Sequence, residues 1–582
     1  MSLLKRMRMR ISRIHIKNFK SLKNVALDDL GDLVVFTGKN SSGKSNILEA
    51  IHLFFNCFNV VEPSPVTSIP EFDTYLWYDL DTQNPITTTV EVKFDATESE
   101  EIFPIKVLTI IKERFPTAYG HVVLSRSIDE KTGWKTEYVK WADIPLVFDN
   151  KLVSPVDFCR SVTASSPEVT TTPPFPESTA AEMIGVIARS LQERIKGKFK
   201  LAKVLRDSAE RPSNLEMRTT ILDSKTYDML RFLKQSRTHE DEQQWNGIER
   251  RFEDTSSMKL DLREGEMFVR IADLCLPLHL IGGGDQETLL LNRFITNHDS
   301  IIAIEEPEMH LHPRLIMGIV AFIKTFSADS QVFLATHSPT IIDHVDLPNI
   351  YLVRMEGKET QIVGFGQTKE LRNMIKQLGI PLSAILFAEK LLVVEGELEK
   401  VMLPIFAKKM GIDPYSFSII SITPKLQSDA GSFTFFFRKK PILEYHLRVW
   451  KEISRTTGIA VFLLLRPMAK KEVETLVHEG TLSDLDYVIL PKAIENLLPV
   501  ELWVNVVNDN YGTTVAVTDI DPTMPRMTEL NRMLLDQKTL PFGWKIHCAE
   551  QVAEKTPIEK IPDEIKMLFA HMMLSLPKEQ KT

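Results

Sequence analysis

The sequence predicts an α/β protein of several domains, in which strands alternate with helices and polar motifs follow the strands. The apolar run Leu33–Phe36 leads into a glycine-rich loop, residues 38–45, and then into a helix-like run, Asn46–Ile51. Two further apolar runs, Ile301–Ile304 and Gln331–Ala335, each end in an acidic or histidine-containing motif. Because ligands of open α/β sheets bind at the carboxyl ends of strands, these motifs are expected to share one site.

Composition fits a globular chain rather than a disordered or fibrous one. The 582 residues suffice for several domains, and the apolar fraction of 43% and charged fraction of 25% are close to average. The net charge of −8 does not favour nucleic-acid binding by the whole surface. Basic residues are nevertheless dense before the glycine-rich loop, where they form either a basic patch or a solvated strand edge: Lys5, Arg6, Arg8, Arg10, Arg13, Lys17, Lys20 and Lys23.

The cysteines and the apolar runs indicate a compartment. Cys57, Cys159, Cys275 and Cys548 are far apart and form no CxxC pair, which argues against a disulfide framework or a zinc cluster. No apolar signal core follows the basic start, and no apolar run is long enough to cross a bilayer. The sequence therefore predicts a soluble cytoplasmic protein with no membrane partner.

The glycine-rich loop has the spacing and the strand–loop–helix context of a phosphate-binding loop. Its glycines allow the backbone to wrap a polyphosphate, and amide N–H groups at the helix start point toward the anion. The alternative is a Gly/Ser-rich hairpin that fits the pattern by chance, and the agreement of strand, motif and helix disfavours it. Lys44 is predicted to reach the outer phosphates and the Ser45 hydroxyl to bind Mg²⁺. The predicted contacts of ATP are Gly38, Asn40, Ser41, Gly43, Lys44 and Ser45.

Two later strands end in residues that would complete such a site. Ile301–Ile304 is followed by Glu305, predicted to hold Mg²⁺, and by Glu306, predicted to activate the attacking water. The second strand is followed by Thr-His-Ser-Pro, in which His337 is placed to contact a γ-phosphate. Each motif alone is common, but their order along the chain predicts an ATPase.

Together these motifs resemble those of ABC-type ATPases of the SMC, Rad50 and RecF branch. The run Glu-Glu-Pro-Glu-x-His-Leu-His-Pro at 305–313, followed by Thr-His-Ser-Pro, looks especially like the OLD (overcoming lysogenization defect) family. The resemblance implies a homodimer or higher homo-oligomer in which two heads enclose ATP, and Gly283 and Gly284 of a signature loop complete the facing site. Gly282 stands where the family has a serine, so a hydroxyl to the γ-phosphate is missing; a simple turn is the alternative interpretation of these glycines.

Three residues after the second acid have two interpretations. His310 and His312, with Glu308, could be metal ligands, but they are expected instead to belong to the loop at the seam between heads.

A later strand also ends in acids. Leu391–Val394 is followed by Glu395 and Glu399, which would share one face of a helix that begins there. The alternative is that these acids are only the charged start of a surface helix. The segment resembles the opening of a Toprim domain, as attached to OLD-family ATPases, and Glu495 matches the family's later acidic motif. That resemblance implies that clustered carboxylates hold a second divalent metal for DNA strand cleavage.

The resemblance fails at one motif. The family's Asp-x-Asp is replaced by Arg466-Pro467-Met468, and an arginine would repel a divalent metal. Asp519 and Asp521 form another Asp-x-Asp, but they follow Glu495 in the wrong order, and a turn is the alternative; Asp429 is a weaker substitute. The sequence therefore predicts a Toprim-like fold with impaired metal chemistry.

The predicted architecture is an ABC-type ATPase head with a helical insertion, followed by an α/β Toprim-like domain. The predicted divisions are 1–180 and 263–375 for the two parts of the head, 181–262 for a helical insertion or dimerisation element, 385–510 for the Toprim-like domain, and 511–582 for a weakly patterned C-terminal segment.

Three functions follow as hypotheses. The first is an ATP-dependent sensor or scaffold on DNA that acts in anti-phage defence, with an inactive Toprim domain and a separate effector protein. The second is an active ATP-regulated endonuclease that uses Glu395, Glu399, Glu495 and an unrecognised acid. The third, a repair or chromosome-structure ATPase with a long coiled-coil arm, is disfavoured because the helical block is short and weakly heptad-patterned.

Overall fold

The computed structural model forms two compact units, Met1–Phe365 and Gly366–Thr582, and each is described here by itself. The structure describes residues 9–56, 84–95, 120–163, 176–203, 224–282, 301–364, 381–421, 449–521, 526–537 and 543–574, apart from short internal gaps, together with a few residues in 99–113 and 285–289.

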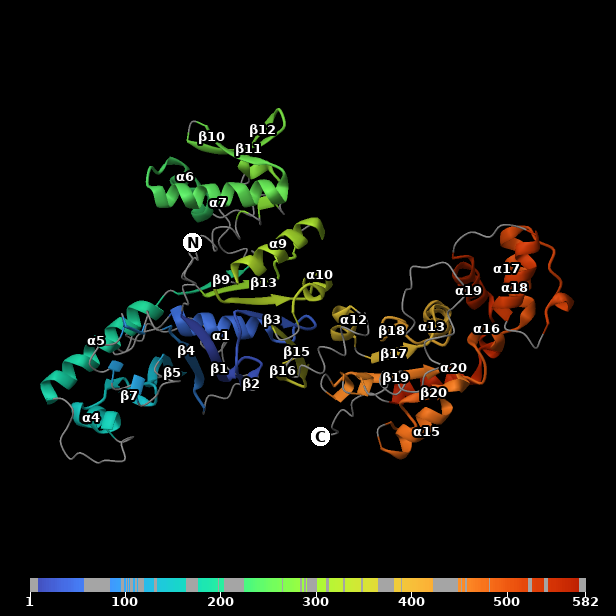
Figure 1. The fold of residues 1–582 in the computed structure, drawn as a ribbon, viewed down its shortest axis with the longest axis horizontal. Helices are drawn as coiled ribbons and strands as arrows, with labels where there is room; N and C mark the ends of the chain where they lie inside the picture. The colour runs from blue at the N-terminus through green and yellow to red at the C-terminus, as the bar shows by residue number, and fades with distance from the viewer. Residues whose placement is uncertain are drawn as a thin grey trace. The chain divides into compact units, whose positions relative to one another are not determined.

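A six-stranded sheet forms the centre of the first unit (Figure 1). Five of its strands are parallel, and only the edge strand β16 is antiparallel to its neighbour. In spatial order the strands are β16 (Glu359–Gly364), β15 (Ile350–Glu356), β3 (Leu33–Thr37), β14 (Val332–Thr336), β13 (Ile301–Glu305) and β9 (Phe199–Lys203). The central strands β3, β14 and β13 consist almost wholly of buried apolar residues, as expected for parallel strands covered on both faces.

Helices follow these strands at their carboxyl ends. Helix α1 (Lys44–Asn56) follows β3, α9 (Pro313–Phe326) follows β13, and the short α10 (Pro339–Asp343) follows β14. The predicted strand–loop–helix context of residues 33–56 is therefore present in the structure.

A seven-stranded antiparallel sheet packs on the other side of α1. Its strands, in spatial order, are β2 (Leu22–Leu27), β1 (Arg10–Phe19), β4 (Ile86–Lys93), β5 (His121–Asp129), β6 (Gly133–Trp141), β7 (Ile144–Phe148) and β8 (Lys151–Leu152). One face of this sheet supplies Ile14 and Val90 to a core that also contains Phe54 of α1 and Phe333 of β14. The core therefore joins the two sheets through α1.

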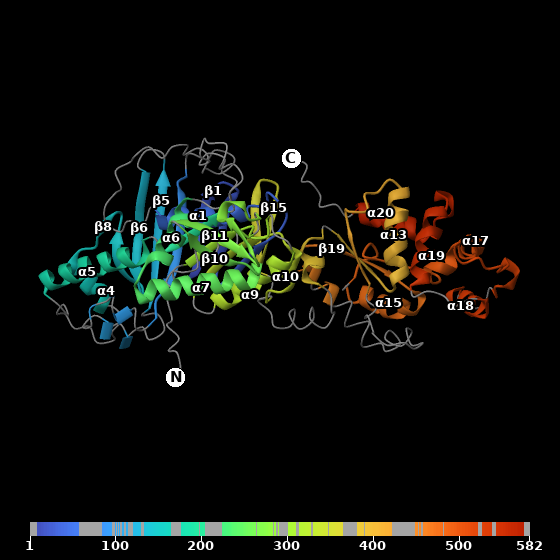
Figure 2. The ribbon, with the colours of Figure 1, turned by 90° about the horizontal axis from the view of Figure 1, so that it is seen from above.

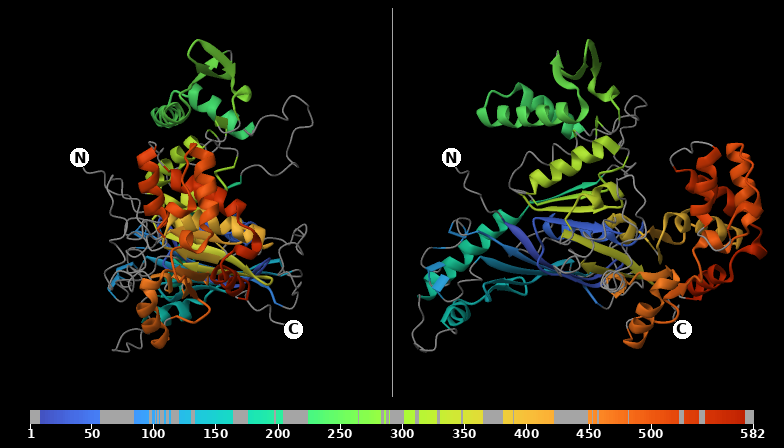
Figure 3. Two further views of the ribbon diagram at one scale, coloured as in Figure 1. Left: turned by 90° about the vertical axis from the view of Figure 1, so that its right-hand side faces the viewer. Right: turned by 45° about the vertical axis from the view of Figure 1, so that its right-hand side comes forward.

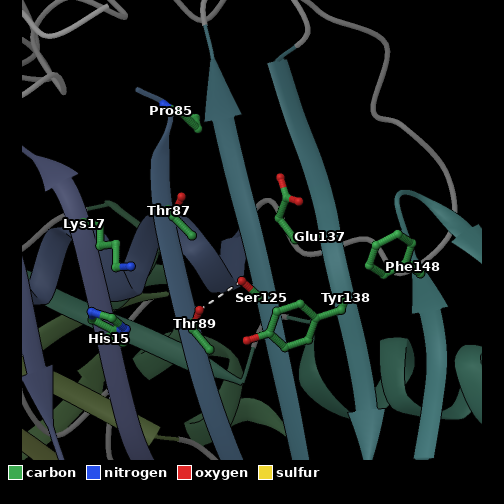
Figure 4. Close-up of a pocket in the computed structure, with 9 residues that line it drawn as sticks. All are labelled: His15, Lys17, Pro85, Thr87, Thr89, Ser125, Glu137, Tyr138 and Phe148. Carbon is green, nitrogen blue, oxygen red and sulfur yellow. Dashed lines mark hydrogen bonds between the residues drawn. The ribbon is translucent and has the colours of Figure 1, made fainter. Parts of the chain in front are cut away.

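The other face of the antiparallel sheet is polar (Figure 4). It carries a cavity of about 440 Å³ lined by residues of five strands and the approach to β4: His15, Lys17, Pro85, Thr87, Thr89, Ser125, Glu137, Tyr138 and Phe148. Four basic residues of the predicted patch are paired with acids: Arg10 with Asp32, Arg13 with Asp28, Lys20 with Glu49, and Lys23 with Glu359. This pairing favours the solvated strand edge over a free basic patch.

The predicted helical insertion divides between two cores. Helix α5 (Glu177–Ile195) packs against α4 (Pro155–Thr163) and contributes to the core that joins the sheets, and β9 belongs to the central sheet. The rest of the predicted insertion, from α6 onward, has a core of its own, which includes Leu230 and Trp245. Its elements are α6 (Ser224–Gln235), α7 (His239–Ser256), β10 (Lys259–Arg263), β11 (Glu266–Ile271) and β12 (Leu274–Pro277). Figure 3 shows α7 and these three strands as a separate cluster above the central sheet.

The second unit contains a four-stranded parallel sheet in the order β18-β17-β19-β20. The strands are β17 (Lys390–Val394), β18 (Ser418–Ser421), β19 (Ala460–Leu465) and β20 (Tyr487–Ile489). The helices in chain order are α12 (Leu382–Leu386), α13 (Glu397–Lys409), α15 (Lys470–His478), α16 (Ile494–Leu497), α17 (Val500–Tyr511), α18 (Arg526–Gln537), α19 (Trp544–Lys555) and α20 (Asp563–Leu574).

The C-terminal segment is part of this unit's core. Helices α18 to α20 bury residues such as Leu530, Val552 and Phe569 against α13 and the sheet, and Figure 2 shows α19 beside α13. Within the described residues, no helix has both the length and the apolar character needed to span a membrane.

Candidate functional site

The glycine-rich loop joins β3 to α1 and depends on two glycines that admit close neighbours. A Cβ at Gly38 would lie 2.0 Å from the carbonyl oxygen of Val353, and one at Gly43 would lie 2.1 Å from Oγ1 of Thr360. Gly38 and Gly43 also have φ angles of 149° and 103°, in the region that glycine tolerates. Asn40 and Ser41 are exposed on the same loop, where a ligand can reach them.

Two hydroxyl groups from other strands hold the loop in place. Oγ1 of Thr360, at the start of β16, lies 3.0 Å from the carbonyl oxygen of Ser42 and 2.7 Å from Oγ of Ser21. Ser21, in the turn between β1 and β2, also accepts a hydrogen bond from the side-chain amide of Asn46 at 2.7 Å. The phosphate loop is therefore fastened to both ends of the first unit's chain.

Lys44 is buried within the loop. Its ammonium donates hydrogen bonds to the carbonyl oxygens of Gly38 at 3.0 Å and Lys39 at 2.8 Å. Burial lowers the pKa of Lys44, and the carboxylates of Glu306, Glu308 and Glu305 act against that change. The ammonium of Lys44 thus lies within the loop and interacts with the three glutamates.

Ser45 and Glu305 face each other across the gap between α1 and β13. The Ser45 hydroxyl donates a hydrogen bond to Oε1 of Glu305. A hydroxyl and a carboxylate are hard oxygen donors of the kind that Mg²⁺ binds beside nucleotide phosphates. The residues present therefore fit the predicted magnesium site of ATP.

Glu306 lies at the end of β13 with a left-handed backbone. Its φ is 48°, which is uncommon for a residue other than glycine, and its amide donates to the carbonyl oxygen of Ala335 at 2.7 Å. Such conformations cost about 1–3 kcal/mol and persist where surrounding contacts enforce them. The side chain of Glu306 is mostly buried, and its Oε1 lies 3.7 Å from Nδ1 of His337.

His337 follows β14, the neighbour of β13, and a second acid approaches it. Oε1 of Glu308 lies 3.3 Å from Nδ1 of His337, accepts a hydrogen bond from the His337 amide at 2.8 Å, and accepts another from the Thr336 hydroxyl at 2.7 Å. The sequence grouped Glu308 with His310 and His312, which lie outside the described residues. Its place beside His337 depends on the pairing of β13 with β14, which the local pattern does not contain.

The predicted signature loop is described only in part. Gly283 and Gly284 lie outside the described residues. The carbonyl oxygen of Gly282 accepts hydrogen bonds from the amides of Asp285 and Gln286, each at 3.1 Å, so a helical turn begins there. The side chain of Gln286 donates to the carbonyl oxygen of Ile281 at 2.9 Å.

In the second unit, acids and an arginine meet at the carboxyl edge of the parallel sheet. Glu395 follows β17, Arg466 follows β19, and Glu495 follows β20 in α16. The guanidinium of Arg466 donates to Glu399 Oε1 at 3.2 Å and lies 3.8 Å from Glu395 Oε2, while its backbone amide donates to Glu395 Oε1 at 2.6 Å. Glu399 and Glu495 are buried, with exposed fractions of 1% and 7%.

The electrostatics of this cluster centre on Arg466. Burial lowers its pKa, but the carboxylates of Glu399, Glu495 and Glu395 outweigh burial, so the pKa of Arg466 is raised. Burial raises the pKa of Glu395 and of Glu495, and the charge of Arg466 acts against both changes. A guanidinium therefore balances the acids at the position where the resemblance implies a metal.

The residues of this cluster do not fit a divalent metal. Among the described residues, no three side chains of His, Cys, Asp or Glu are arranged to hold an ion. The substitute acids give no help: Asp519 accepts a hydrogen bond from the amide of Ala516 and closes a local turn, and Asp429 lies outside the described residues. Glu395 and Glu399 are instead paired with Arg466, and the metal role predicted for Glu395, Glu399 and Glu495 stays a prediction.

Comparison with known proteins shows that the first unit is similar in sequence to ATPase domains. The family model "AAA ATPase domain" matches residues 9–264, and a second, "AAA domain, putative AbiEii toxin, Type IV TA system", matches residues 200–343. Both matches include parts of the site: the phosphate loop lies in the first, and Glu305, Glu306 and His337 lie in the second.

Three relatives each match a short stretch of this chain. An ATP/GTP phosphatase of Helicobacter pylori is 28% identical over 141 residues, which cover 21% of this chain and 38% of that protein. Endonuclease GajA of Bacillus cereus is 31% identical over 105 residues, 18% of each chain. The DNA replication and repair protein RecF of Acinetobacter baumannii is 51% identical over 45 residues, 8% of this chain and 12% of RecF. The matches thus cover well under two thirds of these relatives.

The solved structures to which this chain is similar include two SMC heads. The SMC head domain of Thermotoga maritima has 14% sequence identity and a TM-score of 0.34, with 62% of this chain and 99% of that chain covered. The head of Pyrococcus furiosus bound to the C-terminal domain of ScpA has 13% identity and a TM-score of 0.36, with 64% and 100% covered.

Proposed function

We propose that this protein binds ATP with Mg²⁺ and hydrolyses it at the carboxyl edge of the six-stranded sheet. The observation that carries the proposal is the convergence of the phosphate loop, the acids Glu305 and Glu306, and His337 on three adjacent parallel strands, β3, β14 and β13. The AAA ATPase match over residues 9–264 supports it.

Each residue has a role in this proposal. Lys44 exchanges its contacts with loop carbonyls for phosphate oxygens, and Ser45 and Glu305 hold the metal ion, which neutralises phosphate charge when bound. Glu306 accepts the proton of the attacking water, and His337 meets the γ-phosphate. Positioning and charge stabilisation of this kind account for most of the catalysis in phosphoryl transfer.

The proposed assembly is a homodimer or higher homo-oligomer through the ATPase heads, with Gly283 and Gly284 of one head meeting the nucleotide of another. This part rests on the resemblance to ABC-type ATPases. Because Gly282 offers no hydroxyl to the γ-phosphate, we expect slow turnover and a long-lived ATP-bound state. Such a state suits a sensor or scaffold better than a motor.

We further propose that the second unit is Toprim-like and acts without metal-dependent cleavage. The contacts of Arg466 with Glu399 and Glu395 support this, because two-metal cleavage needs carboxylates that are free to bind cations. The protein would then act on DNA as an ATP-dependent sensor or scaffold, with a separate effector protein. Its role in bacterial anti-phage defence, and its cytoplasmic location, rest on the OLD-family resemblance and on composition.

The second candidate function is an active ATP-regulated endonuclease. Two observations favour it: Glu395, Glu399 and Glu495 meet at one sheet edge, and a stretch of the chain is 31% identical to endonuclease GajA. It requires Arg466 to leave the cluster so that a divalent metal can enter.

One experiment separates the two candidates. Purified full-length protein is incubated with plasmid and phage DNA, with Mg²⁺ or Mn²⁺ and with or without ATP, while ATP binding and phosphate release are measured in parallel. Glu395→Ala tests the acidic cluster, and Glu397→Ala, two residues later at the start of α13 with a side chain that is 43% exposed, is the matched control. Absence of cleavage with retained ATP turnover supports the proposal; cleavage that is lost only in Glu395→Ala supports the endonuclease; absence of ATP binding overturns both.

A further inference from the structure

Glu308 is the third acid of the run 305–308, and the proposed reaction assigns no role to it. Its side chain is only 6% exposed, although burial of a carboxylate is costly without compensating contacts. Its Oε2 is buried and has no hydrogen-bond partner among the described groups. A buried polar atom that lacks a partner requires an explanation, and active sites are a common place for one.

The contacts of Glu308 are concentrated on one short segment. All three neighbours of its Oε1 belong to Thr336 and His337, the two residues at the end of β14: the Thr336 hydroxyl at 2.7 Å, the His337 amide at 2.8 Å and the His337 Nδ1 at 3.3 Å. One oxygen atom therefore fixes both the backbone that carries the imidazole and the ring nitrogen nearest to that backbone.

We infer that Glu308 is a positioning residue for nucleotide recognition, which aims His337 at the γ-phosphate. With Nδ1 held between Glu308 and Glu306, the ring directs Nε2, its other nitrogen, toward a ligand. A carboxylate close to one ring nitrogen favours a proton on that nitrogen and leaves the other nitrogen for a ligand. The imidazole itself is 44% exposed, so without Glu308 few contacts would restrict its rotation.

This inference rests on the proposed function, in that it takes the ligand to be ATP. A positioning role for Glu308 differs from a role in proton transfer, because a positioning residue acts through hydrogen bonds that an amide can reproduce. The Oε1 of a glutamine accepts from Thr336 and His337 as the carboxylate does, whereas alanine accepts nothing. The two substitutions therefore separate positioning from proton transfer.

The test compares Glu308→Ala, Glu308→Gln and His337→Ala in the full chain. Since misplacement of a binding group by about 1 Å can cost as much as 100-fold in rate, we expect Glu308→Ala to lower kcat/KM at least about tenfold. Glu308→Gln should stay within about threefold of the parent, as expected when its hydrogen bonds are kept. In the His337→Ala background, Glu308→Ala should add no further loss, because the two residues act as one unit.

A binding measurement makes the test independent of turnover. The ratio of the dissociation constants of ADP and a non-hydrolysable ATP analogue reports recognition of the γ-phosphate. We expect this ratio to fall to the same value in Glu308→Ala and His337→Ala, and to be retained in Glu308→Gln. If the parent binds nucleotide but releases no phosphate, the proposed hydrolysis fails while this ratio still decides the role of Glu308.

Three results overturn the inference: equal damage from Glu308→Gln and Glu308→Ala, losses that multiply with those of His337→Ala, and an unchanged nucleotide ratio in Glu308→Ala. Glu356→Gln, at an exposed acid of the same unit, is the control and should leave all measurements unchanged. Thermal unfolding monitors the fold. Should Glu308→Ala fail to fold, Thr336→Val removes one of the three contacts and must show a smaller loss that disappears in the His337→Ala background.

Discussion

The guanidinium of Arg466 lies 3.2 Å from the carboxylate of Glu399, a side chain that is almost wholly buried. Arginine presents donors in a fixed planar fork and stays charged at all ordinary pH values. Because Glu395 and Glu495 add their charges to the same place, Arg466 holds the acidic edge of the second unit together without an ion. The pairing of Arg466 with these acids therefore affects both the stability of the second unit and its ability to bind a metal ion.

Replacement of Arg466 by alanine should destabilise the second unit and open it to metal. Removal of one partner of a buried ion pair costs about 3–5 kcal/mol, and we expect somewhat less here because a third of the Arg466 side chain is exposed. Mn²⁺ should raise the melting temperature of Arg466→Ala but not that of the parent. Lys470→Ala, at an exposed pair, is the control. Equal stabilisation of the parent by Mn²⁺ would contradict this account of the cluster.

The stability of the second unit should also depend on pH through Glu495. Burial raises the pKa of Glu495 above its unfolded value, so this side chain favours folding when protonated and opposes folding as the pH rises through its folded pKa. Glu495→Gln should therefore melt at a higher temperature than the parent near neutral pH. The difference should vanish as the pH falls to about 4.3, the ordinary pKa of a glutamic acid. Melting curves between pH 4 and 8 would refute this if the variant were less stable at pH 7.

Lys44→Ala should weaken nucleotide binding strongly. The lysine is the only cation that we assign to the phosphates within the loop, and hydrogen bonds to charged groups contribute about 1.5–3 kcal/mol each, which is roughly a 10- to 150-fold change in affinity. Titration with a fluorescent ATP analogue measures the effect. Lys39→Ala, on the same loop but exposed, is the comparison and should lose much less. Equal losses in the two variants would argue against the assigned role.

Glu306→Gln should preserve ATP binding and block hydrolysis. The amide keeps the size of the side chain but cannot accept a proton, and general-base catalysis typically contributes 10²- to 10⁴-fold. Phosphate release in a single turnover, measured beside the dissociation constant for ATP, separates the two steps. Turnover at the parent's rate in this variant would show that Glu306 is not the general base.

The sequence predicted the strands and the helix that carry the candidate site of the first unit, because their signals are local. The phosphate loop lies between the predicted strand and helix, and the runs at 301–304 and 331–335 correspond to β13 and β14. Each motif is continuous in the chain, so its residue types and its adjacent strand or helix are read together. The expected adjacency of the motifs then follows from the general rule for parallel sheets.

Contacts between distant residues were not predictable in this way. Thr360 meets Ser21 across 339 positions, and Glu308 meets His337 only because β13 pairs with β14. The sequence indicated that Arg466 would oppose a metal, but its enclosure by Glu399 and Glu395 required the structure. The weak pattern in much of the segment after residue 511 has a physical reason too: helices α19 and α20 bury residues against several neighbours, which blurs the amphipathic period of a surface helix.

The contact between Thr360 and the phosphate loop has a mechanical consequence. Thr360 is the second residue of β16, the last strand of the first unit, and the chain continues from β16 into the second unit. Its Oγ1 lies 3.0 Å from the carbonyl oxygen of Ser42, and a Cβ on Gly43 would collide with it. A shift of the loop at Ser42 must therefore either break this contact or displace the strand from which the linker starts. The position of the glycine-rich loop is thus coupled to the last strand of the first unit.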